Sequence, residues 1–143
     1  MRYFLAALAV ASCLAFSVPV MAAKPKIEKV SALVTTGADT LTFKRQAMSS
    51  FSEADRIYHF MTVRWEPIDK GAGRHEVIWR WSVDGKVLSE IKQKPNFHIT
   101  PFELQATLLD TAMGAGRGRI DVLIDGQLFD SREFDVVAQN AGS

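Results

Sequence analysis

Three histidines, His59, His75 and His98, are the side chains of this sequence best suited to binding a metal ion. Histidine pairs that share a metal commonly stand four residues apart on a helix or two apart on a strand. No two of the three histidines have either spacing. We therefore predict no metal site and no metal cofactor.

Serine chemistry has an equally weak signature. Ser49, Ser50 and Ser52 lie close together, but no Gly-x-Ser-x-Gly elbow surrounds any of them, so they are typical of turn and cap residues. The one cysteine, Cys13, lies in an apolar N-terminal segment, and the rest of the chain has no thiol for catalysis or disulfide formation. We predict no catalytic residues, no cofactor and no enzymatic activity.

Three tryptophans allow two interpretations. Trp79 and Trp81 share one face of an expected strand with Val77 and Val83, which favours a buried core position for both rings. Exposed indoles could instead form a stacking platform for sugars, and this alternative, a small carbohydrate-binding module, rests on Trp65, Trp79 and Trp81.

Arginine is common at protein-interaction hot spots, and five arginines are candidates for partner contacts. They lie on expected strands or in the loops around Asp69–Arg74 and Gly114–Arg117: Arg64, Arg74, Arg80, Arg117 and Arg119. The chain has 17 Lys and Arg against 16 Asp and Glu, and this balance provides no long-range attraction for nucleic acid. We expect an envelope protein as the partner.

The first 22 residues resemble a secretory signal peptide. Arg2 provides a positive start, an apolar run extends from Tyr3 to Val18, and small residues follow Pro19 up to Ala22. The apolar run is short for a membrane anchor, so we expect cleavage, no membrane span afterwards, and a periplasmic location. Two alternatives stay open: secretion from the cell, and a lipoprotein anchored through Cys13, because Val10–Cys13 resembles a lipobox.

Residues 23–143 read as a single domain made mainly of β-strands. Strands are expected at Ile27–Thr36, Thr40–Phe43 and Arg56–Trp65. Two hairpins follow, in which Asp-Gly pairs indicate tight turns: His75–Val83 with Lys86–Ile91, and Arg119–Ile124 with Gln127–Phe134. Asp69–Gly73 and Ser49–Asp55 read as loops, with a single helical turn as the alternative for the second.

Residues 102–112 fit a helix and a strand. Thr100–Glu103 forms a capping-box pattern with Pro101 at the first helical position, and these local signals favour a helix. Phe102, Leu104 and Ala106 also alternate with polar residues, as they would on a strand. The predicted fold is an all-β, antiparallel immunoglobulin-like sandwich, with one short helix if the local signals prevail.

Four segments together resemble a bacterial family known as domain of unknown function 2914. They cover most of the chain after the signal peptide: Ala32–Gly37, Asp55–Phe60, Trp79–Lys86 and Gly118–Val122. The sequence departs from the family pattern at Trp79, where histidine is usual, and at Ile120, where tryptophan is common. The resemblance implies a β-sandwich and brings no catalytic residues with it.

Overall fold

A computed structural model describes residues 26–37, 45–108 and 113–139. The expected signal peptide, Cys13 and the expected strand Thr40–Phe43 lie outside the described residues.

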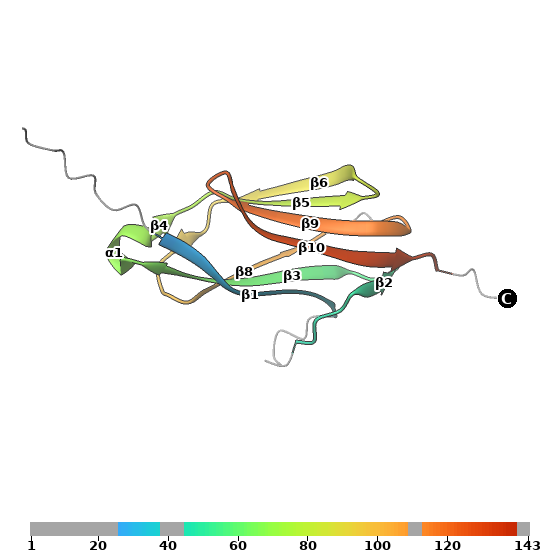
Figure 1. Ribbon diagram of the computed structural model, residues 1–143, viewed down its shortest axis with the longest axis horizontal. Coiled ribbons are helices and arrows are strands. Elements are labelled where there is room, and N and C mark those ends of the chain that lie inside the picture. Colours follow the sequence, from blue (N-terminus) through green and yellow to red (C-terminus); the bar gives the residue numbers. More distant parts are fainter. Residues whose placement is uncertain (1–25, 38–44, 109–112, 140–143) are drawn as a thin grey trace, which may run out of the picture.

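Two sheets face each other, as Figure 1 shows. The first has the strand order β1-β3-β8, with bounds β1 (Lys26–Thr36), β3 (Ile57–Glu66) and β8 (Phe102–Thr107). The second has the order β2-β10-β9-β5-β6, with bounds β2 (Ser50–Ser52), β10 (Gln127–Val137), β9 (Gly116–Ile124), β5 (Val77–Val83) and β6 (Lys86–Gln93). Apart from the parallel β2–β10 pair, neighbouring strands are antiparallel, which confirms the predicted sandwich.

Both predicted hairpins form across their Asp-Gly pairs. Asp84 and Asp125 each have φ of 49°, and the glycines that follow, Gly85 and Gly126, have φ of 78° and 81°. Positive φ at both central residues is the geometry of a type I′ turn, which matches the twist of the flanking strands. The hairpin strands are β5 with β6 and β9 with β10.

Strand β8 (Phe102–Thr107) corrects the helix that local signals favour at the start of residues 102–112, of which residues 109–112 lie outside the described ranges. Residues 102–107 pair with β3, and Leu104 and Ala106 are buried against the opposite sheet. Burial of this apolar face in a sandwich outweighs the capping-box pattern at Thr100–Glu103, because tertiary packing overrides local helix propensity.

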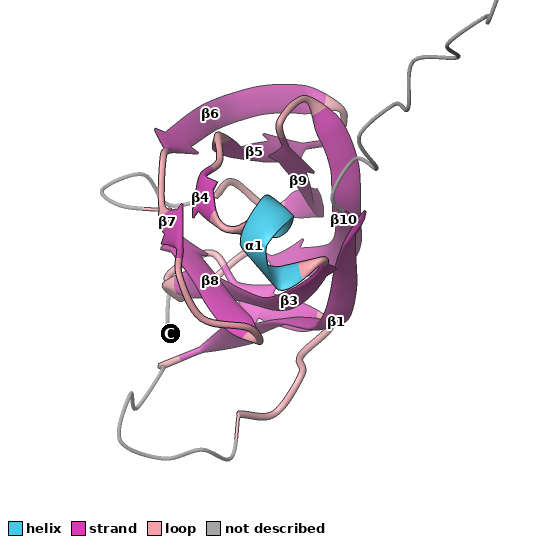
Figure 2. Cartoon of the chain, turned by 90° about the vertical axis from the view of Figure 1, so that its left-hand side faces the viewer, coloured by secondary structure: helices cyan, strands magenta, loops and turns pink. Residues whose placement is uncertain are grey.

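The expected loops also contain short regular elements. A four-residue helix, α1 (Ile68–Gly71), and the two-residue strand β4 (Gly73–Arg74) occupy the segment predicted as a loop, and β2 occupies part of Ser49–Asp55. Strand β4 pairs with β7 (Asn96–Phe97). Figure 2 shows α1 lying across one end of the sandwich. Trp65 holds it there, since its indole N–H donates to the Ile68 carbonyl and its ring packs against Gly71.

The core contains large aromatic side chains from both sheets. Trp79, Trp81 and Phe134 from the five-stranded sheet are fully buried, and Trp65 from the three-stranded sheet is 2% exposed. Gly118 leaves the space that the Phe134 ring occupies, because a Cβ at this position would clash with that ring. Burial of such rings is the main source of stability in a chain of this size.

Candidate functional site

The most unusual cluster in the described residues is a buried carboxylate, Asp130, held between the two sheets. His59 Nε2 lies 2.8 Å from Asp130 Oδ2, and Lys29 Nζ lies 2.8 Å from Asp130 Oδ1. Arg132 Nε donates to both carboxylate oxygens, at 3.1 and 3.2 Å. The His59 ring is completely buried and the Asp130 side chain is 1% exposed, whereas Lys29 and Arg132 reach the surface.

Two β-bulges aim the side chains of this cluster. In β1 the extra residue is Val30, so Lys29 faces the interior where an uninterrupted strand would place Val30. In β10 the extra residue is Phe129, which leaves Asp130 facing inward and Leu128 exposed. Both bulges lie directly beside the Lys29–Asp130 ion pair, so the backbone of each strand is shaped around it.

Asp130 stays ionised in this position. Burial by itself would raise the pKa of the Asp130 carboxyl, but hydrogen bonds from His59, Lys29 and Arg132 outweigh burial and lower the pKa below its ordinary value of 3.8. Because the carboxylate accepts from His59 Nε2, this nitrogen carries a proton, while His59 Nδ1 has no partner among the described residues. The ring offers no surface to a substrate, so the cluster's role is to fix how β1, β3 and β10 pack.

A second histidine joins three elements at the α1 end. His75 Nδ1 lies 2.6 Å from Asp125 Oδ2, and its Nε2 lies 2.7 Å from the Gly71 carbonyl oxygen. The ring also lies against Phe97, with centroids 4.4 Å apart. His75 therefore links α1 to the β9–β10 turn. The third histidine, His98, hydrogen-bonds to the backbone of Asn96. In the described ranges, no group of three or more His, Cys, Asp or Glu side chains is arranged to hold a metal.

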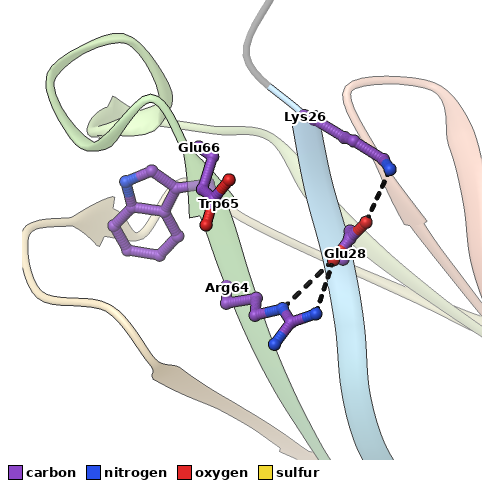
Figure 3. Close-up of a pocket in the computed structure, with 5 residues that line it drawn as sticks. All are labelled: Lys26, Glu28, Arg64, Trp65 and Glu66. Atoms are coloured by element: carbon purple, nitrogen blue, oxygen red, sulfur yellow. Dashed lines mark hydrogen bonds and ion pairs between the residues drawn. The ribbon is translucent and has the colours of Figure 1, made fainter.

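A small pocket of about 220 Å³ lies where β1 begins and β3 ends. Figure 3 shows Glu28 between Lys26 and Arg64, with the Trp65 ring turned away from these charged groups. Glu28 lies 2.8 Å from Lys26 Nζ and 3.0 Å from Arg64 Nη2, and Glu66 adds a second negative charge. Two positive and two negative side chains balance in the lining, so the pocket carries no net formal charge.

The five candidate arginines do not form one surface. Arg80, Arg117 and Arg119 share the outer face of the five-stranded sheet, whereas Arg64 lies on the three-stranded sheet and Arg74 on β4. Most have an acidic partner: Arg80 pairs with Glu90, Arg117 with Asp135 and Glu133, Arg119 with Asp121, and Arg64 with Glu28. Arg74 donates to the Lys94 carbonyl. Paired arginines of this kind do not create a cationic patch.

The three candidate tryptophans are all interior side chains. Trp79 and Trp81 are fully buried in the five-stranded sheet, and Trp65 is covered by α1 and stacks on Phe97 at 5.2 Å. A sugar platform requires exposed rings, and these three rings have no exposed face, so the alternative of a carbohydrate-binding module lacks its surface. All three rings lie where core residues lie, as the first of the two interpretations expects for Trp79 and Trp81.

Strand β6 is the longer of the two edge strands of the five-stranded sheet. Among the described residues its only strand neighbour is β5, and Val87 and Leu88 are 50% and 41% exposed. The other edge strand of this sheet, β2, has three residues. An exposed edge of this length is a template for pairing with another extended segment.

The β5–β9 ladder shows which backbone groups of β6 are free. The Asp125 N–H donates to the Glu76 carbonyl, which makes these two residues a hydrogen-bonded pair across the β5–β9 ladder. Counting along β5 by the antiparallel two-residue period, Ile78 and Arg80 also direct their backbone groups toward β9. Their partners in β6, Lys92 and Glu90, therefore direct their own N–H and C=O groups to the open edge. By the same count, so does Val87, which pairs with Ser82.

Comparison with known proteins identifies the fold. No family model matches the chain, and no curated protein matches it. An immunoglobulin-like protein from Pseudomonas aeruginosa has a similar solved structure, with a TM-score of 0.52 and 12% sequence identity over 81% of this chain and 100% of that one. At this identity the likeness shows the fold alone: the chain is an immunoglobulin-like β-sandwich.

A second solved structure is an alkylpurine DNA glycosylase from Pseudomonas fluorescens bound to DNA containing an abasic site analog. Its TM-score is 0.44, with 18% identity over 81% of this chain and 31% of that one. A likeness at this level carries no argument about function.

In the described ranges, no helix is long and apolar enough to span a membrane. The resemblance to domain of unknown function 2914 stays a prediction, since no family model bears on it.

Proposed function

We propose that this chain is an exported, non-enzymatic binding module of the bacterial envelope, and that it mediates protein–protein interaction through the edge of strand β6. The observation that supports this proposal is the free edge itself. Within the part of the chain that the structure describes, its backbone groups at Glu90 and Lys92 have no partner strand, and apolar Val87 and Leu88 lie beside them. Addition of a strand to such an edge is a common way in which β-proteins bind extended segments.

The remaining features fit a scaffold with its recognition surface at the rim. The buried histidine–carboxylate cluster stabilises the packing of the two sheets, and the charged face of the five-stranded sheet is paired within itself. A neutral surface with saturated ion pairs favours a protein partner over a polyanion. Export is supported by the sequence of the first 22 residues.

Site-specific photo-crosslinking in living cells tests the recognition edge. A photoreactive amino acid replaces Gln93, an exposed residue of β6, in the full chain, and a matched control carries it at Ile68, which is 66% exposed but lies on α1. The expected result is a defined protein adduct from position 93 and none from position 68. The same adducts from both positions, or none from position 93, would contradict β6 as the recognition edge.

Cell fractionation with mass spectrometry tests export. The expected result is release of the chain with the periplasmic fraction and a mature N-terminus that follows Ala22. Recovery from the cytoplasm with the N-terminal segment still attached would contradict export. Retention in the membrane with an acylated Cys13 would instead establish the lipoprotein.

A further inference from the structure

We propose that the β6 edge binds a second copy of this chain, in an antiparallel β6–β6 pair centred on Ile91. This inference rests on the proposed use of β6 as the recognition edge, and it names the partner. The pairing would join two five-stranded sheets into one continuous sheet across a two-fold axis. Three observations carry it: the direction of the backbone groups, the order of charges along the strand, and the position of the bulge.

Backbone direction restricts the centre of such a pair. A two-fold axis perpendicular to the sheet places side chains of the same face opposite each other. The axis must therefore lie between the two copies of one residue, and not between two residues that are neighbours in the sequence. When it passes beside Ile91, Glu90 of each copy lies opposite Lys92 of the other. Both of these residues direct their N–H and C=O groups outward, so each of the two pairs can exchange two backbone hydrogen bonds.

The side chains select the same centre. With the axis at Ile91, each copy places the Glu90 carboxylate beside the Lys92 ammonium of the other copy on the outer face. Moving the axis to Glu90 brings two carboxylates together, and moving it to Lys92 brings two ammonium groups together. Like charges directly opposite each other destabilise a strand pair. Only the Ile91 centre matches unlike charges in the regular part of the strand.

The inner face of β6 is compatible with this arrangement. Ile91 is half-buried and packs at the margin of the core, so the side chains of the two copies would meet across the axis and extend the apolar interior. Glu90 and Lys92 have partners within their own chain, Arg80 at 2.6 Å and Glu76 at 3.7 Å. Arg80 on β5 and Glu76 just before β5 continue the alternation of charge and keep the outer face balanced after pairing.

The bulge at Leu88 limits how far the pairing extends. Ser89 pairs with Trp81 and Val87 with Ser82, so Leu88 is the extra residue that interrupts the ladder. Pairing about Ile91 therefore uses Ser89–Gln93 and stops before the bulge. An overlap this short buries less than the roughly 1,200 Å² of a standard interface, so we expect a weak dimer in rapid exchange with its monomers.

A charge exchange between two variants tests the register. Glu90→Lys places two positive charges opposite each other in its own dimer, and Lys92→Glu places two negative charges opposite each other. An equimolar mixture of the two variants restores two unlike pairs in the mixed dimer. Sedimentation velocity on the full chain, over a concentration series, measures association of the wild type, each variant and the mixture. Far-ultraviolet circular dichroism checks that both variants fold.

The expected result is reversible association of the wild type, at least about tenfold weaker association of each variant alone, and recovery in the mixture. A wild type that stays monomeric at the highest attainable concentration would overturn the proposal. So would variants that associate as well as the wild type, or a mixture that fails to recover. If the wild type is monomeric and the probe at Gln93 still captures a different envelope protein, the proposed function stands and only the self-pairing is wrong.

Discussion

Replacement of Asp130 by asparagine tests whether the buried ion cluster determines how the sheets pack. The carboxylate accepts hydrogen bonds from His59, Lys29 and Arg132. Asparagine has nearly the same shape but only one acceptor oxygen. Its NH₂ group is itself a donor and would face the donors that now bind the carboxylate. The variant therefore leaves two cations and a buried imidazole N–H without their carboxylate.

The burial of each partner sets the size of the effect. Removing one partner of a buried ion pair costs about 3–5 kcal/mol in the free energy of unfolding. Lys29 and Arg132 are 37% and 38% exposed, so they can turn toward water, whereas His59 is completely buried and cannot. We therefore expect a loss near the lower end, about 3 kcal/mol. A loss of this size lowers the melting temperature of a small domain by about 10 °C.

Urea unfolding followed by tryptophan fluorescence measures this loss, because Trp65, Trp79 and Trp81 are buried and their emission shifts when they meet water. Asp135→Asn is the matched control, since Asp135 lies on the same strand and pairs with Arg117 but is 62% exposed. We expect the control to change the free energy of unfolding by about 0.5 kcal/mol or less. A loss below about 1 kcal/mol for Asp130→Asn would refute the structural role assigned to the cluster.

Three further outcomes follow from the same structure. Because the pKa of Asp130 is lowered in the folded chain, its contribution to stability is complete above about pH 5 and is lost progressively as the pH falls below that value. On acidification the urea midpoint should therefore fall less steeply for Asp130→Asn than for the wild type. Gly126→Ala should cost about 1 kcal/mol in thermal unfolding because its φ is 81°, although the site has open space around it, and an unchanged melting temperature would exclude the type I′ turn. Gly118→Ala should cost about 1–3 kcal/mol for a different reason, the clash with Phe134, and the same substitution made in a Phe134→Leu background should cost less if the clash is its cause.

The two hairpin turns could be predicted from the local sequence, because the conformation of a tight turn depends on its own residues. The Asp84-Gly85 and Asp125-Gly126 turns require positive φ, and both hairpins form where that requirement predicts them. Residues 102–107 were different, because a capping box and a strand alternation occupy the same segment. Pairing with β3, far away in the chain, decides between them. Helix α1 was missed because Asp69, Lys70 and Gly71 are typical of a loop, and packing against Trp65 holds the helix in place.

The buried cluster was beyond local patterns for a related reason. The two-residue period puts His59 on the same face of its strand as Ile57 and Met61, but nothing local connects it to Asp130, which is 71 residues away. One signal was available: the two-residue period counted back from Phe134 puts Asp130 on the inner face. The bulge at Val30, which turns Lys29 inward, has no comparable sequence signature. The free edge of β6 depends on strand order, which hairpin signals do not specify.

Hydrogen exchange of individual backbone amides in β6 tests the recognition edge most directly. In dilute solution the inward-directed amides of Ile91 and Gln93 should be protected by β5, while those of Glu90 and Lys92 exchange rapidly. In concentrated solution the amides of Glu90 and Lys92 should slow as the dimer forms, and that of Val87, beyond the bulge, should stay rapid. Rapid exchange at Glu90 and Lys92 at every concentration would contradict pairing of this edge with a second copy. Protection of both at every dilution would contradict a weak dimer whose monomer has a free β6 edge.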